Sequence, residues 1–228
     1  MAAKTEKLST SDKINEFIQK NRKILLFSLV GLLVVIIALA AFFAVRDRVA
    51  TQAFTAVDAF EQRYNALRYS SEPGNWNADL VILRDEIAVF AKKNSGFAAA
   101  RAYTLIAGMY ESHREWAEAE KAWTSAAVSA SKTYFGPVAY FNAAVAAEEH
   151  GNYESAINLY GKAMEYGAGF PSAPRAQFSI GRIYEMRGDS RSALLTYQAL
   201  VGKWPSDQIW VNLAQSRILA LSLDRQIP

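Results

Sequence analysis

Two histidines are the side chains best suited to acid–base chemistry in this sequence of 228 residues. A histidine near neutral pH can act as a general base or bind a metal ion. His113 and His150, however, are 37 positions apart, which is also the spacing at which the residue types around them recur. Both precede a predicted turn between two helices, so we interpret them as turn residues.

Adjacent acidic residues are the second candidate for metal binding. In Asp85-Glu86 and Glu148-Glu149, neighbouring positions on a helix point to different faces, so the two carboxylates of a pair cannot converge on one ion. We therefore expect solvent-exposed charges. The sequence contains no phosphate-binding loop, nucleophile elbow or zinc-ligand spacing. We predict a protein that is not an enzyme and has no cofactor, no metal site and no small-molecule substrate.

An uncharged run of 22 residues, 24–45, dominates the N-terminal part of the chain. At about 1.5 Å per residue, a helix of this length spans about 33 Å, enough to cross a hydrocarbon core roughly 30 Å thick. Lys13, Lys20, Arg22 and Lys23 precede the run, whereas Asp47 partly offsets the two arginines that follow it. The positive-inside rule then predicts a cytoplasmic N-terminus and an exported C-terminal part.

A cleaved signal peptide is the alternative for this segment, because Ala38-Leu39-Ala40 has the small-x-small pattern of a cleavage site. The apolar run is longer than a typical signal core of about 7 to 15 residues, and Phe42, Phe43 and Val45 continue it past the site. These features favour an uncleaved anchor. The absence of cysteine excludes a disulfide framework and a lipidated N-terminal cysteine.

Charge is distributed unevenly about the apolar run. Residues 1–45 hold six Lys or Arg and three Asp or Glu, which gives the whole chain's net charge of +3, so residues 46–228 are neutral. The basic character therefore indicates anionic lipid headgroups rather than nucleic acid. Ile14, Phe17 and Ile18 suggest a short amphipathic helix at the bilayer surface; an unstructured basic leader is the alternative.

Helical periodicity continues through the exported part, and no alternating strand pattern appears. Residues 49–69 contain no Pro or Gly, so the membrane helix can continue as a stalk, and a second helix is predicted for 77–93 after a turn at 70–75. We expect the apolar seams of the two helices to pack as an antiparallel hairpin; a coiled-coil dimer through the first seam is the alternative. The seam residues are Ala53, Val57, Phe60, Tyr64 and Leu67, then Leu80, Leu83, Ile87 and Phe90.

After Phe97 the chain repeats itself with a period of 37 residues, in windows that begin at Ala100, Pro137 and Pro174. Small residues and aromatics recur at fixed places, as two closely packed helices require. The first window has Ile106, Ala107, Tyr110, Trp116, Ala119, Trp123 and Ala126. The second has Ala143, Ala144, Ala147, Tyr153, Ala156, Tyr160 and Ala163, and the third has Ile180, Gly181, Tyr184, Ser190, Ala193, Tyr197 and Leu200.

This pattern resembles the tetratricopeptide repeat, a helix-turn-helix unit of about 34 residues. The middle unit departs by having Ala147 at an aromatic place, and each unit has about three extra residues, which we assign to loops. The resemblance implies an all-α solenoid over 98–228, with a capping helix at 207–223 that includes Ile209, Trp210, Leu213 and Leu221.

The resemblance also implies a peptide-binding groove along the first helix of each unit. The places that usually face the ligand select Arg101, Thr104, Val138, Phe141, Asn142, Val145, Arg175, Phe178 and Arg182, and additionally Glu111, Glu148 and Glu185. Thr104 and Gly108 replace the Lys and Asn of a carboxylate clamp, which argues against that mode. Phe141 and Phe178 between arginines suit a peptide with apolar anchors and some acidic residues; packing between repeats is the alternative.

The whole layout resembles the bacterial single-pass ancillary subunit of the Sec translocon. Its expected parts are a basic cytoplasmic tail (1–23), a transmembrane helix (24–45), a stalk and helical hairpin (46–97) and about three repeats with a capping helix (98–228). The resemblance implies a bacterial inner-membrane protein whose periplasmic repeats contact translocon subunits, chaperones or secreted clients. A scaffold of another envelope machine, in outer-membrane assembly, division or motility, is the alternative.

Overall fold

The computed structural model describes residues 10–69 and 76–224, and the predicted turn at 70–75 lies outside this part of the chain. Every regular element within the described ranges is helical. The elements are α1 (Thr10–Tyr69), α2 (Trp76–Lys93), α3 (Gly96–Ser112), α4 (Trp116–Ser129), α5 (Phe135–Glu149), α6 (Tyr153–Met164), the 3-10 turn η1 (Gly167–Gly169), α7 (Ala173–Met186), α8 (Ser190–Lys203) and α9 (Gln208–Asp224). The predicted all-α class is confirmed.

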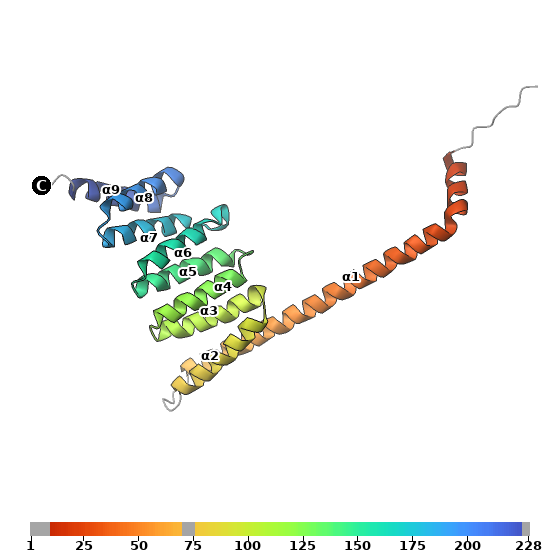
Figure 1. Ribbon diagram of the computed structural model, residues 1–228, viewed down its shortest axis with the longest axis horizontal. Coiled ribbons are helices and arrows are strands. Elements are labelled where there is room, and N and C mark those ends of the chain that lie inside the picture. Colours follow the sequence, from red (N-terminus) through yellow and green to blue (C-terminus); the bar gives the residue numbers. More distant parts are fainter. Residues whose placement is uncertain (1–9, 70–75, 225–228) are drawn as a thin grey trace, which may run out of the picture. The chain divides into compact units, whose positions relative to one another are not determined.

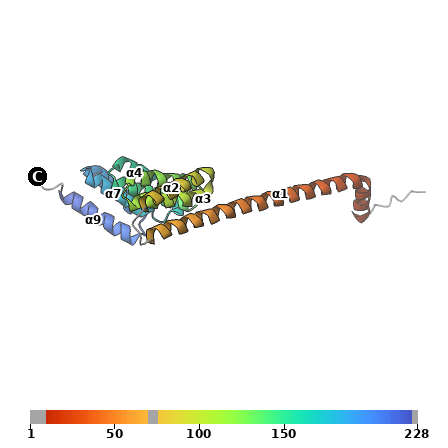
Figure 2. The same cartoon turned by 90° about the horizontal axis from the view of Figure 1, so that it is seen from below.

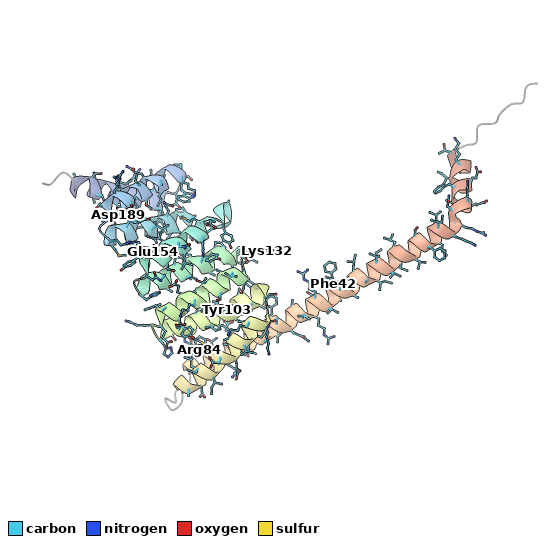
Figure 3. The ribbon with its side chains drawn as sticks, viewed as in Figure 1. Phe42, Arg84, Tyr103, Lys132, Glu154 and Asp189 are labelled. Carbon is cyan, nitrogen blue, oxygen red and sulfur yellow. The ribbon has the colours of Figure 1, made fainter. Side chains whose placement is uncertain are left out.

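Helix α1 begins in the first of two compact units, Met1–Gln52, and ends in the second, Ala53–Pro228. Its 60 residues form one continuous helix, which extends past the apolar run as far as Tyr69. The apolar window has a mean hydropathy of 3.1 and no buried residue, and among the described helices α1 alone is long and apolar enough to cross a membrane. Phe42, labelled in Figure 3, is 61% exposed.

The apolar seam of α1 packs on α2, as the hairpin prediction requires. Val57 is fully buried and Tyr64 is 7% exposed. The rings of Phe60 and Phe90 lie 5.5 Å apart, edge to face, and Arg63 forms an ion pair with Glu86. Because later residues of α1 meet earlier residues of α2, the two helices run antiparallel.

Helices α2 to α8 follow one another through the second unit, and each contacts the next (Figure 1). The period of 37 appears directly in their bounds, because the second helices begin at Trp116, Tyr153 and Ser190. Ala119, Ala156 and Ala193 are fully buried at equivalent places. The predicted repeat is therefore a repeat of burial as well as of residue type.

Gly181 shows why small residues recur at the crossing of the two helices. A Cβ atom at this position would lie 2.5 Å from the Tyr197 ring, so α7 and α8 are closer here than any side chain allows. Gly151 and Gly188 serve another purpose, since both have positive φ in the turn between two helices. Arg114 has φ of 58° at the equivalent place of the first unit, where no glycine is present.

Helix α9 caps the stack at the end opposite α2 (Figures 1 and 2). The Asp207 carboxylate accepts a hydrogen bond from the Trp210 backbone N–H at 3.2 Å, which fixes the start of the helix. Val211, Ala214 and Leu221 cover Tyr197 and Leu200 of α8. The predicted capping helix is confirmed, but Ile209 and Leu213 are 69% and 43% exposed and lie outside that core.

Candidate interaction surface on the first helices

Helices α3, α5 and α7 are the first helices of the three units. We call the side of these helices that holds the predicted groove residues the first-helix face. Several of these residues have partners within the chain. The predicted positions on α3 and α7 are occupied by contacts within the chain, whereas three positions on α5 are less occupied.

Arg101 and Thr104, on α3, are both engaged within the chain. The Arg101 guanidinium donates to Asp58 at 2.8 Å and to Glu61 at 2.9 Å, which ties the repeat stack to α1. The Thr104 hydroxyl donates to the backbone carbonyl of Ala100 at 2.9 Å. Arg101 is thus a link between elements, and the polar group of Thr104 is satisfied within its own helix.

Phe141 and Phe178 lie in clusters of aromatic rings. Phe141 is 7% exposed, with the rings of Tyr160 and Phe170 at 5.1 Å and 6.0 Å. Phe178 is half-buried, 5.2 Å from the Tyr197 ring and 5.4 Å from the Trp210 ring. These contacts favour a packing role between repeats for both rings.

Arg175 and Arg182, on α7, interact with α5. The Arg175 guanidinium carbon lies 4.9 Å from the centre of the Phe141 ring, a cation–π contact that closes the outer side of that ring. Arg182 donates to Glu148 at 2.6 Å. The centre of the predicted groove is therefore filled by the chain's own side chains.

Val138, Asn142 and Val145 form the remaining part of the predicted set, on α5. Val138 is 38% exposed. Asn142 and Val145 are half-buried, and Val145 also packs against the core. These three residues of α5 are the least occupied of the predicted groove positions.

Three glutamates occur at the same place in successive units, and each lies beside the aromatic residue of its own second helix. Glu111 accepts from the indole N–H of Trp123 at 2.7 Å, and Glu185 accepts from the hydroxyl of Tyr197 at 3.1 Å. Burial and then the charge of Glu148 raise the pKa of Tyr160 to about 12, which places those two groups together in the second unit. We call these residues the glutamate row.

Two members of the glutamate row also bind an arginine from the next first helix or from α9. Arg182 pairs with Glu148, and Arg217 contacts both carboxylate oxygens of Glu185 at 2.9–3.1 Å. The side chain of Glu148 is 12% exposed, so the expectation of a solvent-exposed charge was wrong for this residue. Arg217 escaped sequence reasoning because nothing in the sequence places α9 beside Glu185.

Glu148 is the electrostatically strained member of the glutamate row. Its Oε1 atom is buried without a hydrogen-bond partner. Burial raises the pKa of Glu148 above its ordinary value, although Arg182 acts in the opposite direction. The loss of solvent therefore outweighs the ion pair at this carboxylate.

Both histidines lie at helix ends, as predicted. His113 is the C-terminal capping residue of α3, and His150 is that of α5. The His150 Nε2 atom lies 2.7 Å from Glu120. The described part of the chain contains no group of three or more His, Asp or Glu side chains suited to a metal ion.

A cavity of about 630 Å³ lies where the connection from α6 to α7 and the start of α7 meet the junction of α8 and α9. Phe170, Pro171 and Trp204 are among its lining residues, and the Lys203 ammonium lies 4.7 Å from the centre of the Trp204 ring. Sequence reasoning missed this cavity, because it is formed by connections that vary between units.

The helix pairs that recur every 37 residues, with small buried residues at equivalent places, form a helical-repeat solenoid with a fold like that of tetratricopeptide-repeat proteins. A tetratricopeptide-repeat family model matches residues 139–208, which extend from α5 to the start of α9. Over 229 aligned residues the chain is 28% identical to a TPR repeat-containing protein of Treponema pallidum (strain Nichols), with 92% of this chain and 94% of that protein covered.

Solved structures show the same fold. A kinesin light chain from Podosopora anserina with nearly identical TPR-like repeats superposes at a TM-score of 0.51 and 15% identity, over 75% of this chain and 88% of that one. A variant of that protein gives the same TM-score and coverage at 12% identity. At such identities the likeness establishes the fold alone.

Proposed function

We propose that this chain is a membrane-tethered adaptor that binds other proteins on the exported face of a bacterial inner membrane. Helix α1 carries the proposal, because one continuous helix supplies both the apolar span and the seam that enters the repeat core. Such a protein binds its partners only at the membrane surface. The similarity to a repeat protein of a bacterium supports the bacterial setting.

The first-helix face is the proposed contact surface for a partner peptide. Val138 and Asn142 are its best-placed positions, since Phe141, Arg101 and Arg182 already have partners within the chain. We further propose that the partners are translocon subunits, periplasmic chaperones or secreted clients. An exported and anchored adaptor would meet these proteins at the outer surface of the inner membrane.

Crosslinking in living cells tests this function with the full chain. A photoreactive amino acid at position 138 or 142 is compared with one at position 154, because Glu154 is exposed on the second helix α6 (Figure 3). Translocon subunits and exported chains captured only from 138 and 142 support the proposal. A single fixed component of another envelope machine would indicate the scaffold instead, and equal capture from all three positions would refute a contact surface on the first helices.

A further inference from the structure

The glutamate row is complete in two units and incomplete in the first. In the second and third units, each carboxylate lies beside an aromatic residue of its own unit and pairs with an arginine from a later helix, α7 for Glu148 and α9 for Glu185. Arg182 lies 34 residues after Glu148. The residue 34 positions after Glu111 is Val145, which has no charge to offer.

Glu111 is therefore the member of the glutamate row that forms no ion pair within the described part of the chain. Among the described residues, its side chain receives one hydrogen bond, from Trp123, and takes part in no ion pair. The side chain is half-buried, so it has lost part of its water without gaining a counter-ion. A partly desolvated carboxylate with unused acceptor sites favours a cation that reaches it from outside.

Space for such a cation exists beside Glu111. Gly108 lies almost one turn earlier on α3, and a Cβ atom added there would meet nothing within 4 Å. Gly108 and Val145 occupy the repeat places that Arg182 occupies in α7. The side chain that fills this region in the third unit is thus absent from the first two.

We propose that the face between α3 and α5 binds an arginine side chain of a partner protein, with Glu111 as its counter-ion. The partner's guanidinium takes the position that Arg182 and Arg217 take on Glu148 and Glu185. Arginine is preferred to lysine, because its planar fork can reach both carboxylate oxygens, as Arg217 does. This inference rests on the proposed adaptor function and specifies one chemical group of its ligand.

The test uses the full chain in lipid nanodiscs and two sets of fluorescent nonapeptides. One set has arginine at the central position and the other has citrulline, a neutral side chain of nearly the same shape, with identical Ala, Leu, Phe and Ser flanks. Anisotropy should show that the arginine set binds about tenfold more tightly, as expected for a half-buried charge pair.

Two variants assign that preference to Glu111. Glu111→Gln keeps an acceptor for the Trp123 indole but removes the charge, and it should abolish the arginine preference. Val145→Arg supplies the missing cation from within the chain, so it should also abolish the preference and any gain in melting temperature should come from the new ion pair. The double variant Val145→Arg with Glu111→Gln should therefore lose that gain. Glu154→Gln, on exposed α6, controls for net charge and should behave like the wild type.

The results separate the role of Glu111 from peptide binding by the first-helix face. Equal binding of the arginine and citrulline sets, or an unchanged preference in Glu111→Gln, overturns the role of Glu111 while peptide binding by the first-helix face stands. No binding by either set overturns both. Circular dichroism checks that each variant is folded, and Glu111→Gln alone suffices if Val145→Arg does not fold.

Discussion

Arg114 bears the clearest backbone strain among the described residues. The equivalent residues of the next two units, Gly151 and Gly188, adopt positive φ without a side-chain clash. Arg114 adopts φ of 58° although it carries a side chain. A side chain in this region costs about 1 kcal/mol. The sequence showed the two glycines at matching places, but it did not show that Arg114 adopts the same backbone conformation.

Arg114→Gly should therefore raise the free energy of unfolding by about 1 kcal/mol. Urea denaturation of the purified chain measures the change. Arg187→Gly is the matched control, because Arg187 has φ of −84°, where glycine only adds flexibility to the unfolded chain and should lower stability. Equal effects of the two changes would contradict the strain at residue 114.

The pKa of Glu148, raised by burial, has a direct consequence for stability. A carboxyl group whose pKa is higher in the folded than in the unfolded protein favours folding when it is protonated. This contribution to the free energy of unfolding is complete below the unfolded-state pKa and is lost as the pH rises through the folded-state pKa. Glu148→Gln cannot ionise. Its stability relative to the wild type should therefore increase between about pH 4 and about pH 7.

Urea denaturation at these two pH values tests the prediction for Glu148. Glu149→Gln serves as control, because Glu149 is the adjacent acidic residue and is exposed. A relative stability of Glu148→Gln that decreases toward neutral pH would mean that the ion pair with Arg182 outweighs burial.

At the scale of elements, most of the helical arrangement could be predicted from the sequence. The period of 37 fixes three helix pairs, and the second helix of the hairpin was predicted at 77–93 against Trp76–Lys93 in the structure. These predictions succeed because helix length, turn residues and small-residue places are local properties of the chain.

The contacts between units were harder to predict. Arg182 with Glu148 and Arg217 with Glu185 join residues 34 and 32 positions apart, and these pairings depend on how each unit rotates against the next. For the same reason, ligand-facing places carried over from a resemblance could not show that the Phe141 ring is buried below Arg175. The solenoid follows from the repeat, whereas the occupancy of its face does not.

Helices α7 and α8 approach each other closely at Gly181. Gly181→Ala should lower the free energy of unfolding by about 1–3 kcal/mol, because the added methyl group overlaps the Tyr197 ring. Gly161→Ala, in α6, adds a methyl group into open space and should stabilise the helix by about 0.5–1 kcal/mol. Thermal unfolding of both variants separates packing from helix propensity; a gain in both would contradict the close approach at Gly181.

At the scale of the whole molecule, the second unit has its own continuous core, from Val57 in the last part of α1 through α7, and a separate small core below α9. Both ends of the repeat stack are covered, by the hairpin at one end and by the capping helix at the other. Residues 46–228 should consequently fold as a helical monomer without the apolar segment.

Circular dichroism and light scattering of residues 46–228 test this independence. A helical spectrum with a monomer mass is the expected result. A strand-rich or disordered spectrum would show that the repeats need the apolar segment, and an obligate dimer would assign the seam from Ala53 to Leu67 to an interface instead of to α2.

Topology is the prediction on which the adaptor function most depends. Lys13, Lys20, Arg22 and Lys23 lie before the apolar run, and the positive-inside rule keeps such a flank in the cytoplasm. A reporter that is active only after export, fused behind Pro228, should therefore be active, and a cytoplasmic reporter at the same site should be silent.

Replacing the four basic residues by Gln and adding four Lys after Val45 should reverse both signals, because the charge bias would then be inverted. Mass spectrometry of the mature chain completes the test: a chain that begins near Ala41 would reveal a cleaved signal peptide, and the repeats would be released from the membrane instead of tethered to it.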